Sequence, residues 1–495
     1  MFPNLESLNL NDCTSLAELH PSVGFLDKLV HFNLKGCYNV KMFPRIVNMK
    51  SLRYFHLNGC ERLENFPQIV GKMESLIEVD VSRTAIKEVP PSIGYDLFNL
   101  QNLSLYSCKN LTNLPPSIYE LQELRRLKVT GCRKLVLPSI PKKVEYCEVP
   151  TPTSSSKISH YGKATSSEGE SDCDGGGDAD DDQGNLAFPS LRYFLAGGCT
   201  SDCDFIVRLG CVSTLIELDF SESNVVSLPA GLTKFINLEE LNLRGCKRLQ
   251  EVSELPPNLK VLKVGDCLSL ERISKLSNIL KHQESQMFEW LDLTSCWRLR
   301  DNLVQEAETK GLLVNYDHQV EADLFSLFLS SQKSEFGVVF PGYEIPKWLS
   351  CRMDFRGNLL FEFDIQVLPN FKWVNTGLAL CVAAEEMLDW GFEIVINEVL
   401  LPISRLRNRI RNGIWNAGAI SDGVWLFYIP FGRIDMGLFD NECPLPPFQC
   451  RVTIFQILDS NEVPMKSCGV HLVMPPNEEC MKLSHAWNLS DENVW

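Results

Sequence analysis

The sequence predicts an α/β solenoid, a curved stack of repeats with a parallel β-sheet on its concave face, followed by an all-β antiparallel sandwich. Three observations support this fold class. An apolar pattern returns every 23 or 24 residues near the N-terminus, it resumes after a polar interruption, and residues after 335 form apolar runs bounded by Pro, Gly and Asn. A chain of 495 residues is also too long for one core, so several structural units are expected.

The repeating pattern begins at Leu5 and continues through Leu8, Leu10 and Cys13, in the frame L-x-x-L-x-L-x-x-C. Apolar residues that alternate with polar ones form a strand with one buried face. One repeat cannot bury that face alone, so stacked repeats form a continuous core. The frame is that of a leucine-rich-repeat horseshoe, with about six repeats in residues 1–149. They begin at Leu5, Leu29, Leu52, Leu76, Leu100 and Leu124.

A polar segment, residues 150–187, interrupts the repeats. It is rich in Ser, Thr, Gly and Asp, and from Glu168 to Asp182 it carries eight carboxylates and no basic residue. Such a segment cannot bury enough apolar surface to offset its ordering entropy, so we expect a disordered surface insertion, with a regulatory or partner-binding role as the alternative. About five further repeats follow in residues 188–300. They begin at Leu191, Leu215, Leu238, Leu259 and Phe288.

Two other residue types recur in register with the frame. Prolines between the strands disfavour long helices and predict extended or 3₁₀ segments on the convex side. Nine of the 19 cysteines directly follow a strand, where a buried thiol acts as a small apolar group. Because the count is odd and the spacing follows the repeat, we expect reduced thiols. Cys199, Cys203 and Cys211 lack the paired spacing of a zinc site, so no metal is expected.

After the repeats the character of the sequence changes twice. Residues 301–335 have helical spacing at Asn302 to Gly311 and at Val320 to Ser331, which predicts a helical cap or linker. Residues 336–476 are predicted to form the antiparallel sandwich, and residues 477–495 a tail. The predicted strands are Leu359–Val367, Gly377–Ala383, Phe392–Leu401, Val424–Pro430, Arg451–Leu458 and Cys468–Met474.

Composition and motifs exclude several classes of function. The net charge of −16 argues against nucleic acid or an anionic membrane as the main partner, because both require clustered Lys and Arg. The sequence has no run of 18 apolar residues and no secretory signal pattern, so a cytoplasmic location is expected, with the nucleus as a second option. HExxH, GxSxG and GxxxxGK[ST] motifs are absent. We therefore expect no catalytic residues, no enzyme activity and no cofactor.

Further features of the repeats resemble a known family. Leu57–Leu63 (LNGCERL) and Leu243–Leu249 (LRGCKRL) are similar to repeats of plant intracellular immune receptors of the TIR–nucleotide-binding–leucine-rich-repeat type. Val81–Pro90 resembles the alternate repeat, in which Thr84 replaces the cysteine. Phe340–Trp348 (FPGYEIPKW) resembles the opening of the jelly-roll/Ig-like domain that follows the repeats in that family. The motif residues are Pro341, Gly342, Glu344, Ile345, Pro346 and Trp348.

The resemblance implies a role in plant innate immunity. It implies that the repeats and the following domain bind a pathogen effector or a guarded host protein, and that the repeats contact the nucleotide-binding module in an autoinhibited receptor. The TIR and nucleotide-binding modules are absent from these residues, so NAD cleavage and nucleotide binding are not expected, and we expect a receptor fragment or a truncated member. Two alternatives stay open: a regulator or decoy of full-length receptors, and a scaffold or substrate adaptor unrelated to immunity.

The strand frame also predicts where a protein partner binds. Residues that flank the buried strand positions point out of the concave face. Tyr, His, Arg and Trp are scattered among them, and such side chains serve as interface anchors. The predicted contact residues are His31, Asn33, Lys35, Tyr54, His56, Asn58, Glu78, Asp80, Tyr106, Arg126, Lys128, Tyr193, Glu217, Asp219, Glu240, Arg244 and Trp290.

Overall fold

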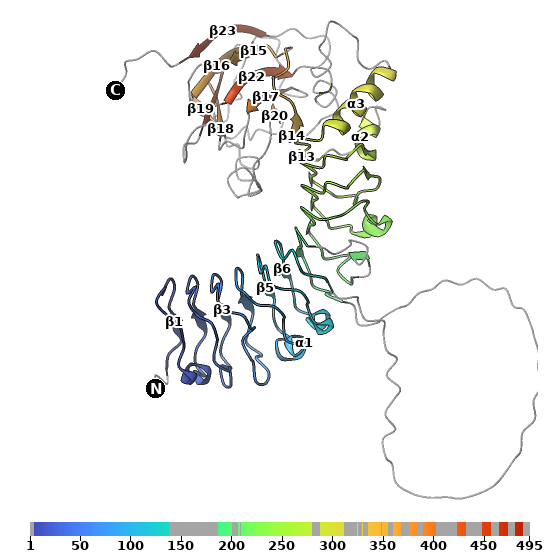
Figure 1. Cartoon of the computed structure of the whole chain (residues 1–495). Coiled ribbons are helices and arrows are strands. Elements are labelled where there is room, and N and C mark those ends of the chain that lie inside the picture. Colours follow the sequence, from blue (N-terminus) through green and yellow to red (C-terminus); the bar gives the residue numbers. More distant parts are fainter. Residues whose placement is uncertain are drawn as a thin grey trace, which may run out of the picture.

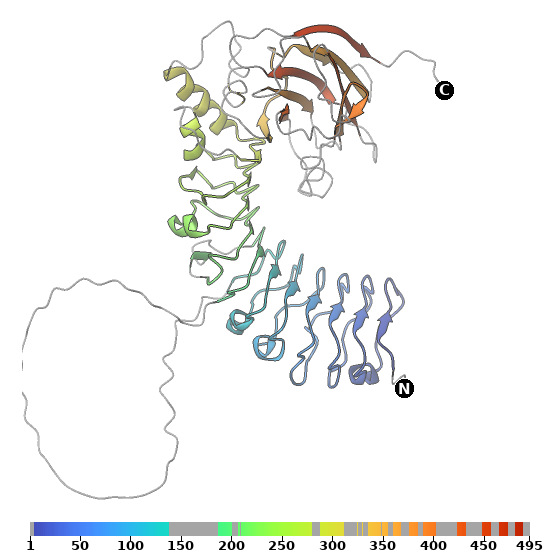
Figure 2. The same ribbon diagram turned by 180° about the vertical axis from the view of Figure 1, so that it is seen from behind.

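The computed structural model arranges the repeats as a curved row of short strands that ends against a second group of longer strands (Figure 1). Seen from behind, the short helices lie on the outer side of the curve and the C-terminal strands on the inner, concave side (Figure 2). The structure describes residues 4–137, 187–199, 206–207, 209–279, 288–310, 324, 329, 335–347, 349–354, 360–367, 376–384, 390–401, 423–431, 448–456, 465–473 and 481–488.

Each repeat contributes one short strand to a parallel sheet, as the frame predicts. Neighbouring strands pair in register, so that Leu8 lies opposite Phe32 and Phe32 opposite Phe55. The central residue of each strand from β2 onward is buried beneath the sheet. The strands are β1 (Ser7–Asn9), β2 (His31–Asn33), β3 (Tyr54–His56), β4 (Glu78–Asp80), β5 (Asn102–Ser104), β6 (Arg126–Lys128), β7 (Tyr193–Leu195), β8 (Glu217–Asp219), β9 (Glu240–Asn242), β11 (Val261–Lys263) and β13 (Trp290–Asp292).

The sheet continues across the interruption without a missing strand. Strand β6 pairs directly with β7, and Leu127 lies opposite Phe194. Ala187, which we expected at the end of the insertion, is only 7% exposed and belongs to the core. The rest of the predicted insertion, residues 150–186, lies outside the described residues.

The convex side contains short helices and extended segments, as the recurring prolines predict. A 3₁₀ helix begins directly at a proline in two repeats, and in a third it begins directly after Pro229. These elements are η1 (Pro21–Phe25), α1 (Ile93–Asp96), η2 (Pro116–Glu120) and η4 (Ala230–Lys234). Near the end of the solenoid, the convex side adds the paired strands β10 (Glu251–Val252) and β12 (Arg272–Ile273) and the helix α2 (Ser274–Ile279).

The cysteines that follow the strands connect consecutive repeats. The Cys246 thiol donates to the carbonyl oxygen of Phe220 at 3.2 Å, and the same contact to the preceding repeat recurs at most of these positions. Burial raises the pKa of Cys246 to about 12, so the thiol stays protonated and unreactive. Just before the cysteine the chain adopts positive φ; at Gly36 an added Cβ would lie 2.1 Å from Asp12 Oδ1.

A longer helix, α3 (Trp297–Thr309), follows the last repeat strand. It begins five residues before the predicted Asn302, and it buries Leu299, Leu303 and Ala307. Of the second predicted helix, Val320–Ser331, only Leu324 and Leu329 are described, and both are buried. The remainder of that helix lies outside the described residues.

The C-terminal strands are not a separate unit, contrary to our expectation, because β14 (Phe336–Pro341) pairs in parallel with β13 of the last repeat. Strand β14 also pairs antiparallel with β20, so the solenoid sheet continues as β14-β20-β17-β22-β15. A second antiparallel sheet has the order β19-β18-β21-β16-β23. The strands are β15 (Cys351–Asp354), β16 (Leu360–Val367), β17 (Gly377–Ala384), β18 (Trp390–Ile396), β19 (Val399–Leu400), β20 (Gly423–Pro430), β21 (Phe448–Gln456), β22 (Met465–Val473) and β23 (Met481–Asn488).

The two C-terminal sheets share one apolar core. Phe361 and Phe363 of β16, Val452 of β21, Leu380 of β17 and Trp425 of β20 belong to a single buried cluster. The predicted antiparallel strand pairing is therefore confirmed, whereas the jelly-roll/Ig-like topology stays a prediction. The expected tail is wrong in part, because β23 lies within residues 477–495 and pairs with β16.

Candidate protein-interaction surface

The concave face presents the first and third residues of the repeat strands. Of the 17 predicted contact residues, 15 are exposed or half-buried there, and Arg244 and Trp290 are buried. A parallel sheet places side chains of equivalent position in rows across the strands. The concave face is therefore a continuous surface from His31 on β2 to Glu240 on β9.

The N-terminal part of this surface is aromatic and weakly charged. The rings of His31 and Tyr54 stack with centroids 4.7 Å apart, which joins β2 to β3. His56 Nε2 lies 3.0 Å from Glu78 Oε1, and Asn102 donates to the other oxygen of Glu78 at 3.4 Å. These cross-strand contacts fix side chains that would otherwise be mobile on the surface.

A groove of about 520 Å³ crosses the concave face from β4 to β7. The carboxylates of Glu78 and Asp80 line the groove at β4, and four basic side chains line it at β6 and β7. We name these four residues the basic cluster. They are Arg125, Arg126, Lys128 and Arg192.

Tyrosine rings hold two of the cations in place. The Arg126 guanidinium lies 4.2 Å from the centroid of the Tyr193 ring, and Lys128 Nζ lies 4.5 Å from that of Tyr106. A cation over an aromatic face is stabilised by about 0.5–1 kcal/mol at an exposed site. The contact orders the side chain but leaves its N–H groups able to donate to a ligand.

An acidic section follows the groove. Glu217, Asp219 and Glu240 lie on β8 and β9, and Lys263 Nζ approaches Glu240 Oε1 at 2.7 Å. Burial, and then the nearby charge of Glu240, raise the pKa of Glu217 to about 7. Burial also raises the pKa of Asp219, although the carboxylate accepts from the Ser221 backbone N–H at 2.8 Å.

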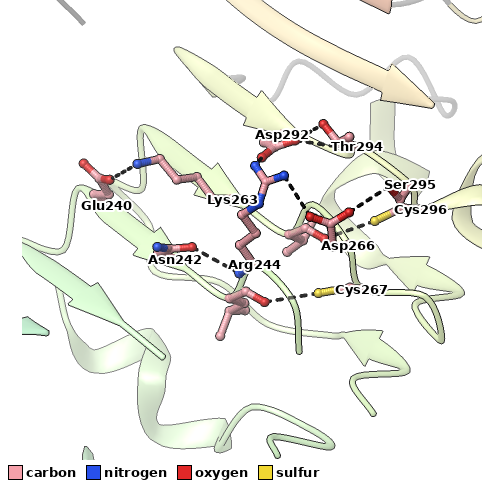
Figure 3. Close-up of polar contacts among 12 residues, drawn as sticks. Glu240, Asn242, Arg244, Lys263, Asp266, Cys267, Asp292, Thr294, Ser295 and Cys296 are labelled. Atoms are coloured by element: carbon pink, nitrogen blue, oxygen red, sulfur yellow. Dashed lines mark hydrogen bonds and ion pairs between the residues drawn. The ribbon is translucent and has the colours of Figure 1, made fainter. Parts of the chain in front are cut away.

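Arg244 is not a contact residue, because its side chain is enclosed between repeats. Its guanidinium donates to Asp266 Oδ2 at 2.8 Å and to Asp292 Oδ2 at 3.0 Å (Figure 3). The hydroxyl of Ser295 donates to the other oxygen of Asp266, and Thr294 donates to Asp292 through both its N–H and its hydroxyl. Buried charges require such pairing, so Arg244 stabilises the last repeats instead of meeting a partner.

Trp290 is likewise buried, with 4% of its surface exposed. Its ring lies 5.7 Å from that of Phe427 on β20, and a Cβ added at Gly337 would lie 2.4 Å from the Trp290 ring. The frame assigned Trp290 correctly to the outward row. The C-terminal strands cover this row at β13, so the prediction of a contact residue is wrong here.

The motif that begins at the end of β14 is mostly buried in the part that the structure describes. Pro341, Gly342, Ile345 and Pro346 are buried, whereas Glu344 is exposed. A Cβ at Gly342 would meet Val424 of β20 at 3.0 Å, so the motif passes close to the neighbouring strand. Trp348 lies outside the described residues.

Two members of the basic cluster were missed by the sequence analysis. Arg125 and Arg192 each come one residue before their strand, outside the outward positions that the frame selects. The signal available was the adjacent pair Arg125-Arg126 in a chain whose net charge is −16. Neighbouring strands bring this pair beside Arg192, which is distant in sequence.

Neither a metal site nor a membrane-spanning helix is found in the part of the chain that the structure describes. No three His, Cys, Asp or Glu side chains there converge in a way that could hold a metal ion. No helix within the described ranges is long and apolar enough to cross a bilayer. Cys199 and Cys211 are described and buried, and Cys203 lies outside the described residues.

Comparison with known proteins identifies the repeats. Residues 47–140 and 181–294 match the family described as disease resistance protein RPS4B-like, leucine-rich repeats. TMV resistance protein N of Nicotiana glutinosa is 33% identical over 293 residues, 55% of this chain and 24% of that protein. Disease resistance protein RPS4B of Arabidopsis thaliana is 27% identical over 384 residues, 76% of this chain and 25% of that protein.

The chain spans about a quarter of the length of these two relatives. Among solved structures, the leucine-rich repeat domain of the type III effector XopL is 23% identical, with a TM-score of 0.31, and the match covers 46% of this chain and 63% of that one. The solenoid of this chain is a leucine-rich-repeat region homologous to those of plant disease resistance proteins.

Proposed function

We propose that the concave face, from His31 to Glu240, recognises a protein: a pathogen effector or a guarded host protein bound by a plant immune receptor. The support comes from the homology of the repeats to disease resistance proteins and from the form of the surface. Its strands run in register from β2 to β9, so one partner can contact many repeats at once. That continuous outward surface is the observation that carries the proposal.

The chemistry of the surface is suited to selective binding. Histidine and tyrosine side chains lie at its N-terminal end, a charged groove follows, and carboxylates occupy β8 and β9. Charges arranged in this order admit a partner with the opposite order and repel others. Aromatic side chains supply the contact area from which most binding energy arises.

We also infer the wider setting from the family. The proposed receptor works in the cytoplasm or nucleus, its repeats contact the nucleotide-binding module in the resting state, and the C-terminal sheets form the jelly-roll/Ig-like domain of the family. In this proposal the chain binds partners and performs no catalysis. The carboxylates and histidines of the concave face then serve as contact and positioning groups.

The test is a binding screen of candidate effectors against the full chain, followed by substitution on both faces. Tyr54→Ala removes a half-buried ring from the concave face, and Tyr95→Ala removes an exposed ring from the convex helix α1. We expect at least a tenfold loss of affinity, about 1.4 kcal/mol, for Tyr54→Ala and no loss for Tyr95→Ala. The reverse result would place the binding surface on the convex side.

A further inference from the structure

We propose that the basic cluster, Arg125, Arg126, Lys128 and Arg192, binds a short acidic segment of the protein partner. The inference rests on the proposed function and assigns a ligand chemistry to one part of the concave face. Arg126 and Lys128 are the first and last residues of β6, and Arg125 and Arg192 directly precede β6 and β7, so four positive charges line the groove beside these two neighbouring strands.

The four cations have no carboxylate partner within 4.0 Å among the described residues. Two other cations of the repeats are paired: Lys263 contacts Glu240 at 2.7 Å, and Arg244 contacts two aspartates. Four unpaired cations close together repel one another, which is an unfavourable arrangement for the free protein. A ligand with several carboxylates would relieve that repulsion and form charge-assisted hydrogen bonds.

The tyrosine contacts prepare the cluster for binding. Arg126 lies over Tyr193 and Lys128 over Tyr106, so these two long side chains are already restricted before a ligand arrives. Ordering a free Arg or Lys side chain on binding has an entropic cost, and this preorganisation removes part of that cost. The rings carry no charge, so the full positive charge of both residues stays available.

Strands with outward carboxylates lie on both sides of the basic cluster and limit the length of the ligand. Glu78 and Asp80 on β4 lie before the cluster, and Glu217 and Asp219 on β8 lie after it. Adjacent strands are separated by about 4.8 Å, so about 19 Å separates the two acidic strands. A continuous phosphate backbone would extend into these carboxylates and be repelled, whereas a few consecutive Glu or Asp residues of a protein fit between them.

The test uses a fluorescently labelled hexaglutamate peptide, with hexaglutamine as the uncharged comparison, and full-length protein. We expect hexaglutamate alone to bind, with an affinity that falls as salt is raised from about 0.05 to 0.3 M because exposed charges are screened. Lys128→Glu should weaken binding at least tenfold. Lys234→Glu, an equal charge change at an exposed site on convex η4, should leave binding within twofold.

Thermal unfolding of each variant shows that a loss of binding is not a loss of folding. Equal weakening by Lys128→Glu and Lys234→Glu would mean a response to net charge only and would overturn the assignment.

Stronger competition by single-stranded RNA than by hexaglutamate would overturn the assignment in favour of nucleic acid. Tenfold tighter binding after deletion of residues 152–184 would identify the chain's own acidic segment as the occupant. If Tyr54→Ala abolished binding of an effector and Lys128→Glu left that binding unchanged, the acidic-segment proposal would be refuted and the proposed function of the concave face would stand.

Discussion

At the scale of single residues, the same side-chain type has different roles along the solenoid because its neighbours differ. Arg126 stacks on a tyrosine and faces the groove, whereas Arg244 is enclosed by Asp266 and Asp292. Both occupy outward positions of the repeat frame, so the frame alone cannot separate them. Ion pairs between repeats and coverage by other strands decide which outward residues can meet a ligand.

Glu217 provides a residue-scale prediction about pH. Its pKa of about 7 in the folded protein lies above the ordinary glutamate value of 4.5, so the folded state favours the protonated form. Stability from this group is therefore complete below pH 4.5 and lost as the pH rises through 7. Glu217→Gln should raise the free energy of unfolding at pH 8.5 by about 1–2 kcal/mol, with solvent screening considered, and change it little at pH 4.5.

Urea unfolding of both proteins at pH 4.5 and 8.5 measures this difference. Glu123→Gln, at an exposed position, is the matched control and should leave the pH dependence of stability unchanged. An equal effect of Glu217→Gln at both pH values would show that the pKa of this carboxyl is the same in the folded and unfolded states and that its burial has little energetic effect.

At the scale of elements, the strands of the solenoid were predictable because the apolar residues of each repeat pack against the next repeats along the chain. Leu103 and Leu127 are buried by the repeats adjacent in sequence, and apolar spacing records this directly. The coverage of Trp290 was not predictable, since it depends on strands β14 and β20, which lie far along the chain. The outward rows of the candidate site were predicted from the repeat frame. The groove was not predicted, because Arg192 reaches the groove only through the pairing of β6 with β7.

The direct pairing of β6 and β7 leads to a prediction at this scale. Because the two strands are hydrogen-bonded across the interruption, the solenoid does not need the intervening polar residues to continue its sheet. Deleting residues 152–184 should change the free energy of unfolding by no more than about 1 kcal/mol, since loop length affects stability only weakly. Guanidinium unfolding followed by circular dichroism measures it, and a loss of several kcal/mol would show that the segment packs on the repeats.

At the scale of the whole molecule, the solenoid and one of the two C-terminal sheets form a single hydrogen-bonded sheet. Strand β14 belongs to both parts, and Trp290, Gly337 and Phe427 fill the space between them. Contacts of this kind favour joint unfolding of the two parts. In the region homologous to disease resistance proteins, the concave face is therefore joined to the C-terminal strands through a shared sheet.

Trp290→Ala tests this connection. Removing the ring leaves a cavity between β13 and β20, which should lower the free energy of unfolding by about 3–5 kcal/mol and loosen the junction. We expect calorimetry to show one transition for the native chain and two for the variant. Phe235→Ala, which removes a fully buried ring from the convex side far from the junction, should lower the transition temperature without splitting the transition.

The shared strand β14 also limits how the molecule can respond to a bound partner. In the main sheet, the strands β1 to β9, β11, β13 and β14 are each hydrogen-bonded to the next, so the described strands leave no unpaired junction at which one part could swing. A conformational response has to be divided into small rotations between adjacent repeats, and a change of about 1° at each of some ten junctions would tilt the far end by about 10°. A ligand bound in the groove near β6 would thus change the curvature of the solenoid and shift the position of the C-terminal strands.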